Sequence, residues 1–349
     1  MSGKARIGVI GAGWWATLSH IPALRANPHV GRVAVMRPDA NGLAQVVERF
    51  PGVVPYQDAA AMLAAEPLDG VVVASPHVFH AEHGQMALSK GLPTLIEKPM
   101  ATTAADARAL VATAERHGAA IVLPYGWNFK PIVETAHRLV AEGWIGEVRH
   151  IAAQMASALA DLFGGEPMAE TKDHLFRPPV STWADPARAG GYGWGQLTHG
   201  LGALFRIVDL DPVAVFAKTG LSPAGVDFYD AAVVEFANGA TMALSGAATV
   251  PKSRGYQIDI RIFGSDGMLL FDIERARVEA VRHDGKSHIA DFGAEAGAYE
   301  LVAPITLLVE LSRGAAAKNP ADGKVGLRAA LVLDALYRSA LSGRMEAAG

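Results

Sequence analysis

The first 125 residues alternate short apolar runs with segments whose apolar residues recur at helical spacing. The apolar runs predict strands over Arg6–Ile10, Arg32–Met36, Gly70–Ala74, Thr94–Glu97 and Ala120–Pro124. Helical spacing predicts one helix from the first strand's end through Leu24, and others over Asn41–Arg49, Ala59–Ala65, Ala81–Lys90 and Thr103–His117. Strands that alternate with helices form right-handed βαβ units with a parallel sheet. We therefore expect an α/β fold here.

The pattern changes near Tyr125. A helix is predicted over about Ile132–Glu142 and a strand over Val148–Gln154, followed by a stretch rich in glycine, proline and polar residues over Phe163–Tyr192. Asn238-Gly239 between two alternating runs is a strong hairpin signal. The remaining predicted elements are strands at Ala231–Ala237, Ala240–Ala248, Tyr256–Phe263, Met268–Asp272 and Arg277–Arg282, and a helix at about Gly326–Ser342. We predict two domains, 1–125 and 126–349, with the last helix able to pack back toward the first.

Composition removes several classes of function. Half of the 349 residues are hydrophobic, the net charge is −4 and no basic tract is present, so we expect no nucleic-acid partner. The absence of cysteine excludes disulfides, thiolate zinc sites, iron–sulfur clusters and cysteine nucleophiles. No apolar run approaches the length of a membrane span, and Met1-Ser2-Gly3-Lys4 leads directly into the first predicted strand. We expect a cytoplasmic protein without a signal peptide or a membrane partner.

The first strand ends in Gly11-Ala12-Gly13-Trp14-Trp15-Ala16, a Gly-x-Gly-x-x-Ala pattern. Gly11 permits a tight turn, Gly13 lets a pyrophosphate approach the backbone, and Ala16 lets the next helix pack close to the sheet. The pyrophosphate would bind at the helix N-terminus, where free N–H groups favour an anion. An ordinary strand–turn–helix is the alternative. The position of the pattern between a strand and a helix favours a dinucleotide site.

The second strand ends in Arg37-Pro38-Asp39. Sites for NAD usually place an acidic residue about 20 residues beyond the glycines, where it holds the adenosine ribose. Arg37 occupies that place, and its guanidinium can pair with a 2′-phosphate. We predict that NADP(H) is favoured and NAD(H) possible. Two alternatives stay open: Asp39 turns inward and selects NAD, or Arg37 is simply solvated.

Two further groups of residues carry candidate chemistry. Glu97-Lys98-Pro99 follows a predicted parallel strand, and the carboxyl ends of such strands face the ligand. The alternative for Lys98 is a solvated loop lysine or an ion pair with Glu97. His77, His80 and His83 suggest a metal, but their spacing is only partly helical and no cysteine or clear carboxylate completes a set. We expect no metal site.

Together these motifs resemble the Gfo/Idh/MocA family of sugar and polyol oxidoreductases. The resemblance covers nearly the whole chain, and Glu97-Lys98-Pro99 is its most specific element. The other motifs that carry it are Gly11-Ala12-Gly13, Ala74-Ser75-Pro76-His77 with His80, and Gly190-Gly191 leading to His199. It implies an N-terminal Rossmann domain over 1–125 and a C-terminal substrate and oligomerisation domain over 126–349. The latter would have a large open, mostly antiparallel sheet that forms a homodimer or homotetramer.

The resemblance also implies site residues. Lys98 would be the catalytic lysine beside the nicotinamide, and His199 the general acid/base. Together with the residues themselves, the resemblance makes the candidate cofactor-binding residues Gly11, Gly13, Trp14, Trp15, Arg37, Ser75, Pro76, His77, His80, Glu97, Lys98 and Asn128. The candidate substrate-binding residues are Trp15, Lys98, Trp183, Gln196 and His199; plain packing is the alternative for Trp14 and Trp15, and a surface loop is the alternative for Trp183. For His199, a buried structural histidine is the alternative.

The third motif departs from the family pattern. The family commonly has an aspartate four residues before the histidine and an acidic residue three after it, and here these positions are Gly195 and Gly202. Leu197 replaces a glycine between them. The departure concerns the substrate class and the proton path more than the fold. Gln196 or Thr198 is expected to take over a polar contact.

The resemblance predicts an NAD(P)-dependent dehydrogenase or reductase that transfers hydride between nicotinamide and a sugar, a polyol or a derivative. Hydride transfer from a carbinol also requires a proton to leave, and Lys98 and His199 suit that chemistry. Two alternatives remain. One is a redox-assisted glycosidase with no net cofactor turnover, and the other is a non-catalytic sensor of cofactor or sugar.

Overall fold

The computed structural model describes residues 3–349, without the side chain of Ala294. Met1 and Ser2, which begin the segment expected to hold no signal peptide, lie outside the described residues. The chain divides into two compact units. The first comprises Met1–Pro124, Pro167–Thr182 and Leu301–Leu327, and the second comprises Tyr125–Glu166, Trp183–Glu300 and Arg328–Gly349. Each unit therefore draws on several separate segments of the chain.

The first unit contains a six-stranded parallel sheet in the order β3-β2-β1-β4-β5-β6. Its strands are β1 (Ala5–Ile10), β2 (Val30–Met36), β3 (Val54–Tyr56), β4 (Gly70–Val73), β5 (Thr94–Ile96) and β6 (Ile121–Val122). This is the strand order of doubly wound dinucleotide-binding folds, whose ligand crevice lies where the order reverses between β1 and β4. The predicted α/β fold is confirmed. The edge strand β3 was not predicted.

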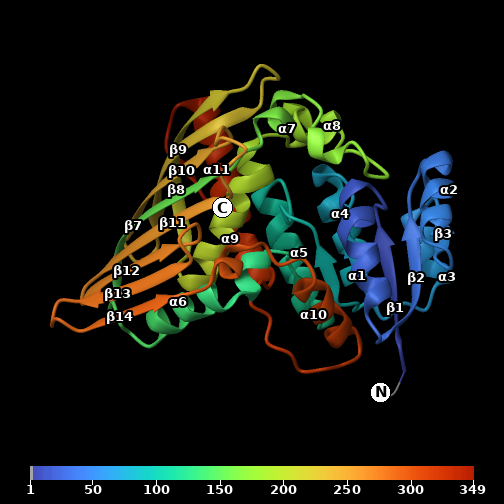
Figure 1. The fold of residues 1–349 in the computed structure, drawn as a ribbon, viewed down its shortest axis with the longest axis horizontal. Helices are drawn as coiled ribbons and strands as arrows, with labels where there is room; N and C mark the ends of the chain where they lie inside the picture. The colour runs from blue at the N-terminus through green and yellow to red at the C-terminus, as the bar shows by residue number, and fades with distance from the viewer. Residues whose placement is uncertain (1–2) are drawn as a thin grey trace. The chain divides into compact units, whose positions relative to one another are not determined.

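Helices pack against this sheet (Figure 1). They are α1 (Ile21–Ala26), α2 (Ala40–Arg49), α3 (Ala59–Ala65), α4 (His80–Leu88), α5 (Ala104–His117) and α10 (Ala303–Ser312). The helices α3, α4 and α5 contact one another in series, whereas α10 contacts α1 and packs against β1, β4, β5 and β6. The unpredicted α10 joins the core of the first unit although it lies near the end of the sequence.

Backbone hydrogen bonds join the loops at the carboxyl ends of neighbouring strands. The N–H of Gly11 donates to the carbonyl of Met36 at 3.0 Å, and the N–H of Ala74 donates to the carbonyl of Ile10 at 2.8 Å. The N–H of Glu97 donates to the carbonyl of Val73 at 2.8 Å. The glycine turn, the Ser75 loop and the Glu97-Lys98 loop therefore start from one continuous edge of the sheet.

The second unit contains a nine-stranded sheet in the order β14-β13-β12-β11-β7-β10-β9-β8-β15. Its strands are β7 (Val148–Ala156), β8 (Pro212–Leu221), β9 (Asp227–Phe236), β10 (Thr241–Ala247), β11 (Gln257–Gly264), β12 (Gly267–Asp272), β13 (Arg277–Arg282), β14 (Ser287–Asp291) and β15 (Glu346–Ala347). All neighbours are antiparallel except β7 and β10. The mostly antiparallel sheet and the hairpin at Asn238-Gly239 are confirmed.

Helices α6 (Pro131–Ala141) and α9 (Thr198–Ile207) pack together and contact this sheet at β12, β13 and β7 (Figure 1). The other helical segments with residues in this unit are η3 (Gly126–Phe129), α7 (Ala160–Gly164), α8 (Val180–Trp183), η5 (Pro186–Arg188), η6 (Gly193–Leu197), η7 (Ala294–Gly297) and α11 (Gly323–Ser342). The helix α9 carries His199. Across the described part of the chain, no helix is both long and apolar enough to cross a membrane.

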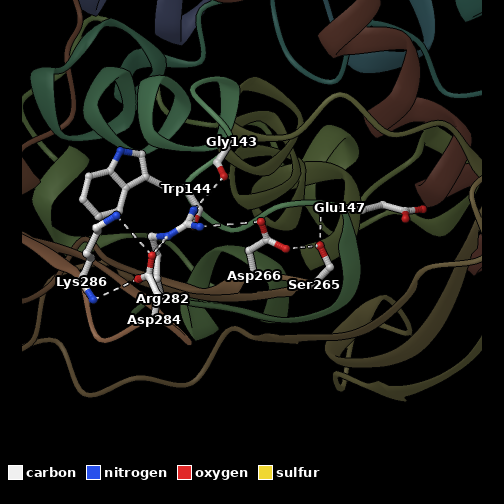
Figure 2. Close-up of polar contacts among 8 residues, drawn as sticks. All are labelled: Gly143, Trp144, Glu147, Ser265, Asp266, Arg282, Asp284 and Lys286. Carbon is white, nitrogen blue, oxygen red and sulfur yellow. Dashed lines mark hydrogen bonds and ion pairs between the residues drawn. The ribbon is translucent and has the colours of Figure 1, made fainter.

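A polar cluster ties the turn after α6 to two hairpins of the sheet (Figure 2). The guanidinium of Arg282 donates to the carbonyl of Trp144 at 3.1 Å and pairs with Asp284 at 3.3 Å and with Asp266 at 3.8 Å. The hydroxyl of Ser265 donates to Asp266 at 2.8 Å. Because the carboxylates of Asp266 and Asp284 are exposed, the cluster orders the turns and contributes little free energy of folding.

Candidate active site

The glycine turn of the first unit is built for close backbone approach. Gly11 has φ +95°, and a Cβ there would lie 2.4 Å from the backbone nitrogen of Ser75. The N–H and the hydroxyl of Thr17 donate to the carbonyl of Gly13 at 3.0 Å and 2.9 Å, so the helical run starts at the second glycine. The structure thus has the strand–turn–helix context that the dinucleotide prediction requires.

Trp14 and Trp15 follow directly, with their rings edge to face at 5.5 Å. The indole N–H of Trp14 donates to Nδ1 of His174 at 3.0 Å. His174 belongs to 167–182, a segment that packs with the first unit although its neighbours in sequence belong to the second. We call 167–182 the strap.

Arg37, at the end of β2, lies between the glycine turn and the strap. Its Nη1 donates to the carbonyl of Ala12 at 3.1 Å, and its Nη2 lies 3.4 Å from the carboxylate of Asp39. The ring of Phe176, also in the strap, lies 4.1 Å from the guanidinium carbon. Asp39 accepts from the N–H groups of Asn41 at 3.2 Å and Gly42 at 2.9 Å and so caps α2.

The loop after β4 carries Ser75 and Pro76 and leads into η2 (His77–Phe79). His80 is buried, with Nε2 2.6 Å from the carbonyl oxygen of Ser75 and Nδ1 2.7 Å from that of Pro99. It therefore links this loop to the loop that carries Lys98. Burial lowers the pKa of His80, and its two carbonyl partners oppose that effect.

The other two histidines of this region, His77 and His83, also contact residues of the Ser75 loop and of the helix that follows it. His83 Nδ1 lies 2.9 Å from the hydroxyl of Ser75, and the ring of His77 lies edge to face with His80 at 5.8 Å. Among the described residues, no group of three or more His, Asp or Glu is arranged to hold a metal ion.

Lys98 follows β5 and is half-buried. Burial lowers the pKa of Lys98 to about 8, and the negative charge of Glu97 acts in the opposite direction. Glu97 itself is 7% exposed, and its carboxylate lies 2.8 Å from Nε2 of His20. Burial would raise the pKa of Glu97, but the hydrogen bond and charge of His20, with the charges of Lys98 and His80, lower it. Glu97 is thus an anion beside Lys98.

In the second unit, His199 lies near the start of α9 and is 6% exposed. Three aromatic rings surround it edge to face: Tyr299 at 5.2 Å, Trp127 at 5.7 Å and Tyr125 at 5.9 Å. The hydroxyl of Tyr299 lies 3.4 Å from Nδ1. Tyr125 also bonds the hydroxyl of Thr198 at 2.9 Å. His199 is held in an aromatic setting with a neutral hydroxyl as one partner.

The two glycines that depart from the family pattern have a steric explanation. A Cβ at Gly195 would lie 2.6 Å from ring atoms of Phe163 and 3.2 Å from Trp183. A Cβ at Gly202 would lie 2.6 Å from the ring of Tyr125. Aromatic rings occupy the space that acidic side chains would need, so both carboxylates are absent for a shared packing reason.

The remaining predicted residues also belong to the second unit. Gln196 is buried in η6, and the amide of Asn128 donates to the carbonyl of Gly202 at 3.0 Å. The ring of Trp183 lies 6.2 Å from that of Phe163. The roles of these residues stay predictions. Residue patterns alone did not reveal His20, His174, Phe176 or Tyr299, because each is part of the site only through a contact with a residue that is distant in the sequence.

Comparison with known families decides the classification. The profile described as "Oxidoreductase family, NAD-binding Rossmann fold" matches residues 5–125, and the profile described as "GFO/IDH/MocA C-terminal domain" matches residues 133–270. The chain belongs to the Gfo/Idh/MocA family. The resemblance inferred from the motifs is confirmed, and so are the NAD-binding Rossmann domain and the oxidoreductase class.

Individual relatives of the family are distant. The dTDP-3,4-didehydro-2,6-dideoxy-α-D-glucose 3-reductase of Streptomyces antibioticus is 28% identical over 92% of this chain and 93% of its own length. The D-xylose 1-dehydrogenase [NADP(+)] of Haloarcula marismortui is 27% identical over 60% of this chain and 56% of its own length. The chain thus spans about half the length of several curated relatives that it matches.

Among solved structures, GenD2 from gentamicin A biosynthesis in complex with NAD has a TM-score of 0.76 to this chain. It is 22% identical, and the match covers 99% of this chain and 97% of that one. This likeness supports the fold of the family throughout the chain.

Proposed function

We propose that the protein transfers hydride between NADP(H) and a carbinol or carbonyl carbon of a sugar, a polyol or a derivative. The observation that carries the proposal is Lys98, which follows β5 at the sheet edge shared with the Gly11 turn and has a pKa lowered to about 8. A lysine with a pKa near neutrality can exchange a proton and can stabilise a developing alkoxide.

The residues at this edge fit a dinucleotide. Gly11 leaves no Cβ between β1 and the Ser75 loop, and the helical run after Gly13 begins where a pyrophosphate would lie, so its positive N-terminal dipole would favour the anion. When bound, the nicotinamide accepts or returns the hydride. The carboxylate of Glu97 bonds His20 and the N–H of Lys98, so we propose that Glu97 positions the lysine.

Lys98 and His199 have separate proposed roles. Neutral Lys98 would hydrogen-bond the reacting oxygen and stabilise its negative charge as hydride leaves the carbon. His199 would take up or return the hydroxyl proton. The aromatic rings around His199 exclude water from one side of the imidazole and suit the apolar face of a sugar ring.

The cofactor preference rests on Arg37. Asp39, the rival for the ribose, uses its carboxylate to cap α2. Arg37 presents a guanidinium beside the glycine turn, where a 2′-phosphate would be repelled by an acid and attracted by this cation. The name of the Haloarcula relative includes NADP(+), whereas GenD2 was solved with NAD, so the preference is proposed from Arg37 itself.

A substrate panel tests the proposed activity. Aldoses, inositols and anhydrosugars are each incubated with NADP⁺ or NAD⁺, and reduced nicotinamide is followed by absorbance. Net NADPH formation with at least one sugar or polyol supports the proposal. Glycoside cleavage without net NADPH would favour a redox-assisted glycosidase, and cofactor binding without turnover of any substrate would favour a sensor.

We further propose a homodimer or homotetramer formed through the nine-stranded sheet. The pairing register aligns Val233, Ala243, Ala152, Arg261, Leu270, Glu279 and Ile289 across one face of that sheet. Val233 is 45% exposed and Ile289 is 50% exposed, and a second copy that covered this face would bury both. Light scattering of the wild-type protein and of Val233→Lys tests this proposal, which requires smaller particles for the variant.

A further inference from the structure

We propose that the strap, residues 167–182, forms part of the binding site for the adenosine 2′-phosphate half of the cofactor, and that Phe176 is its specificity-determining residue. The inference rests on the proposed preference for NADP(H) and goes beyond it, because it assigns cofactor recognition to a segment outside the Rossmann sequence.

The strap is fastened to the cofactor loops at two points. His174 accepts the indole N–H of Trp14 at 3.0 Å, directly after the second glycine of the turn. Phe176 lies 4.1 Å from the guanidinium carbon of Arg37, at the end of the neighbouring strand β2. Two contacts to two adjacent strand ends fix the strap beside the turn that would receive the pyrophosphate.

The contact with Phe176 orients Arg37 without consuming its hydrogen bonds. An aromatic ring attracts a guanidinium through its face, whereas all five N–H donors of the guanidinium point outward in its plane. Nη1 is directed at the carbonyl of Ala12, and Nε is buried without a hydrogen-bond partner in the described structure. Arg37 is therefore held in one plane while it retains donor capacity for phosphate oxygens.

Gly42 provides the room for this arrangement. A Cβ at position 42 would lie 2.1 Å from Nε of Arg37 and 2.4 Å from a carboxylate oxygen of Asp39. A side chain there would push the guanidinium away from the first turn of α2. The first turn of α2, the glycine turn and the strap thus contact Arg37 from three segments.

Binding experiments test the inference without knowledge of the sugar. Calorimetry with NADP⁺, NAD⁺, 2′,5′-ADP and 5′-ADP is performed on the wild type, Phe176→Ala, Phe176→Tyr, Arg37→Ala and the double variant. We expect Phe176→Ala to lower the affinity for NADP⁺ and 2′,5′-ADP about five- to tenfold. The affinity for NAD⁺ and 5′-ADP should stay within about twofold of the wild-type value. Phe176→Tyr should retain the wild-type affinities, because it keeps the aromatic face.

The double variant should bind NADP⁺ no more weakly than Arg37→Ala alone, because Phe176 acts through Arg37. Arg49→Ala is the matched control, since Arg49 contacts an aromatic ring of the same unit, Phe50, from the last turn of α2. It should leave all four affinities unchanged. Gly42→Ala should reproduce the selective loss of NADP⁺ affinity.

The outcomes separate the two proposals. If Arg37→Ala leaves NADP⁺ affinity unchanged, the cofactor preference under the proposed function is wrong. If Arg37→Ala weakens NADP⁺ but Phe176→Ala does not, only the role of the strap is overturned. Tighter binding by Phe176→Ala also overturns it, because the ring would then compete with the cofactor. Phe176 is half-buried, and thermal unfolding without cofactor checks that each variant is folded.

Discussion

The hydroxyl of Tyr299 lies 3.4 Å from Nδ1 of His199, although 100 positions separate the two residues. A carboxylate in this place would raise the pKa of an imidazole through its charge, whereas a hydroxyl is neutral and can either donate or accept. The tyrosine thus supplies an orienting partner without the electrostatic effect of the aspartate that is missing at Gly195. We expect a different proton path from that of family members with the aspartate.

The first prediction concerns this pair. Tyr299→Phe should lower kcat/KM about fivefold, the net worth of one hydrogen bond, and should change the pH–rate limb assigned to His199. In the wild type that limb should lie near or below the ordinary histidine value of about 6.5, and His199→Asn should remove it. Tyr229→Phe is the matched control, because Tyr229 is exposed and its hydroxyl bonds Thr249 at 3.0 Å. An unchanged profile in His199→Asn would exclude His199 as the titrating group.

The second prediction concerns Lys98. Lys98→Ala should lower turnover by about two orders of magnitude or more while cofactor binding, followed by fluorescence, changes little. Because the neutral amine is the active form in carbinol oxidation, kcat/KM should rise with pH through about 8, the lowered pKa of Lys98. This limb should be absent from the variant. Lys90→Ala, at an exposed turn, is the control. Turnover within a few-fold of wild type would mean that Lys98 has another role.

The third prediction separates charge from shape at Glu97. The carboxylate raises the pKa of Lys98 against the larger effect of burial, so Glu97→Gln should move the alkaline limb to lower pH. The same variant weakens the buried contact with His20, and we expect the free energy of unfolding to fall by about 1–3 kcal/mol. Rate profiles from pH 6 to 10 measure the shift. A limb that moves to higher pH would contradict the electrostatic role.

The sequence was informative where chemistry depends on local order. Single strand–loop segments determine the parallel strands, the glycine turn and the position of Lys98 after β5. The hydrophobic periodicity and the sequence motifs therefore predicted these features. The helix α9 was missed for a physical reason: almost every residue in Thr198–Ile207 is buried, so no polar face marks a helical period, and Gly200 and Gly202 lower its helix propensity. The mostly buried α10 was missed for the same reason. The strand β3 has only three residues and β14 has no buried residue, so neither shows the buried face that marks a strand.

The partners of the site residues could not be predicted from local patterns. In the sequence His20 is an ordinary helical residue, and only the structure shows that it lies 2.8 Å from Glu97. Phe176 belongs to a stretch with no strong helical or strand period. The explanation for Gly195 needed the rings of Phe163 and Trp183, which the sequence leaves in a polar loop region. Such contacts join residues that are far apart in the sequence. Local patterns in a single sequence do not show which distant residues come into contact.

The last prediction concerns a buried carboxyl pair on β9, Asp227 and Asp230, each 3% exposed. Asp227 accepts from the N–H of Gly193 at 2.7 Å and from the hydroxyl of Tyr337 at 2.7 Å. No N–H or O–H group of the other described residues donates to either carboxylate oxygen of Asp230, whose side chain interacts with that of Asp227. Burial and the charge of Asp227 raise the pKa of Asp230 well above its ordinary value.

The raised pKa of Asp230 sets the sign of its effect on stability. At a pH below about 3.9, the pKa of an aspartate in the unfolded chain, the carboxyl is protonated in both the folded and the unfolded state. The group then has no effect on the free energy of unfolding through its charge. As pH rises toward the folded value, the unfolded chain ionises freely while the folded chain resists, so the free energy of unfolding falls. Asp230→Asn should therefore stabilise the protein at pH 7.5 but much less at pH 4, as measured by urea unfolding. Asp227→Ala, the contrast, should destabilise by about 1–3 kcal/mol because it leaves the Gly193 N–H without its acceptor. Equal effects of Asp230→Asn at both pH values would show that the buried charge is not what the substitution removes.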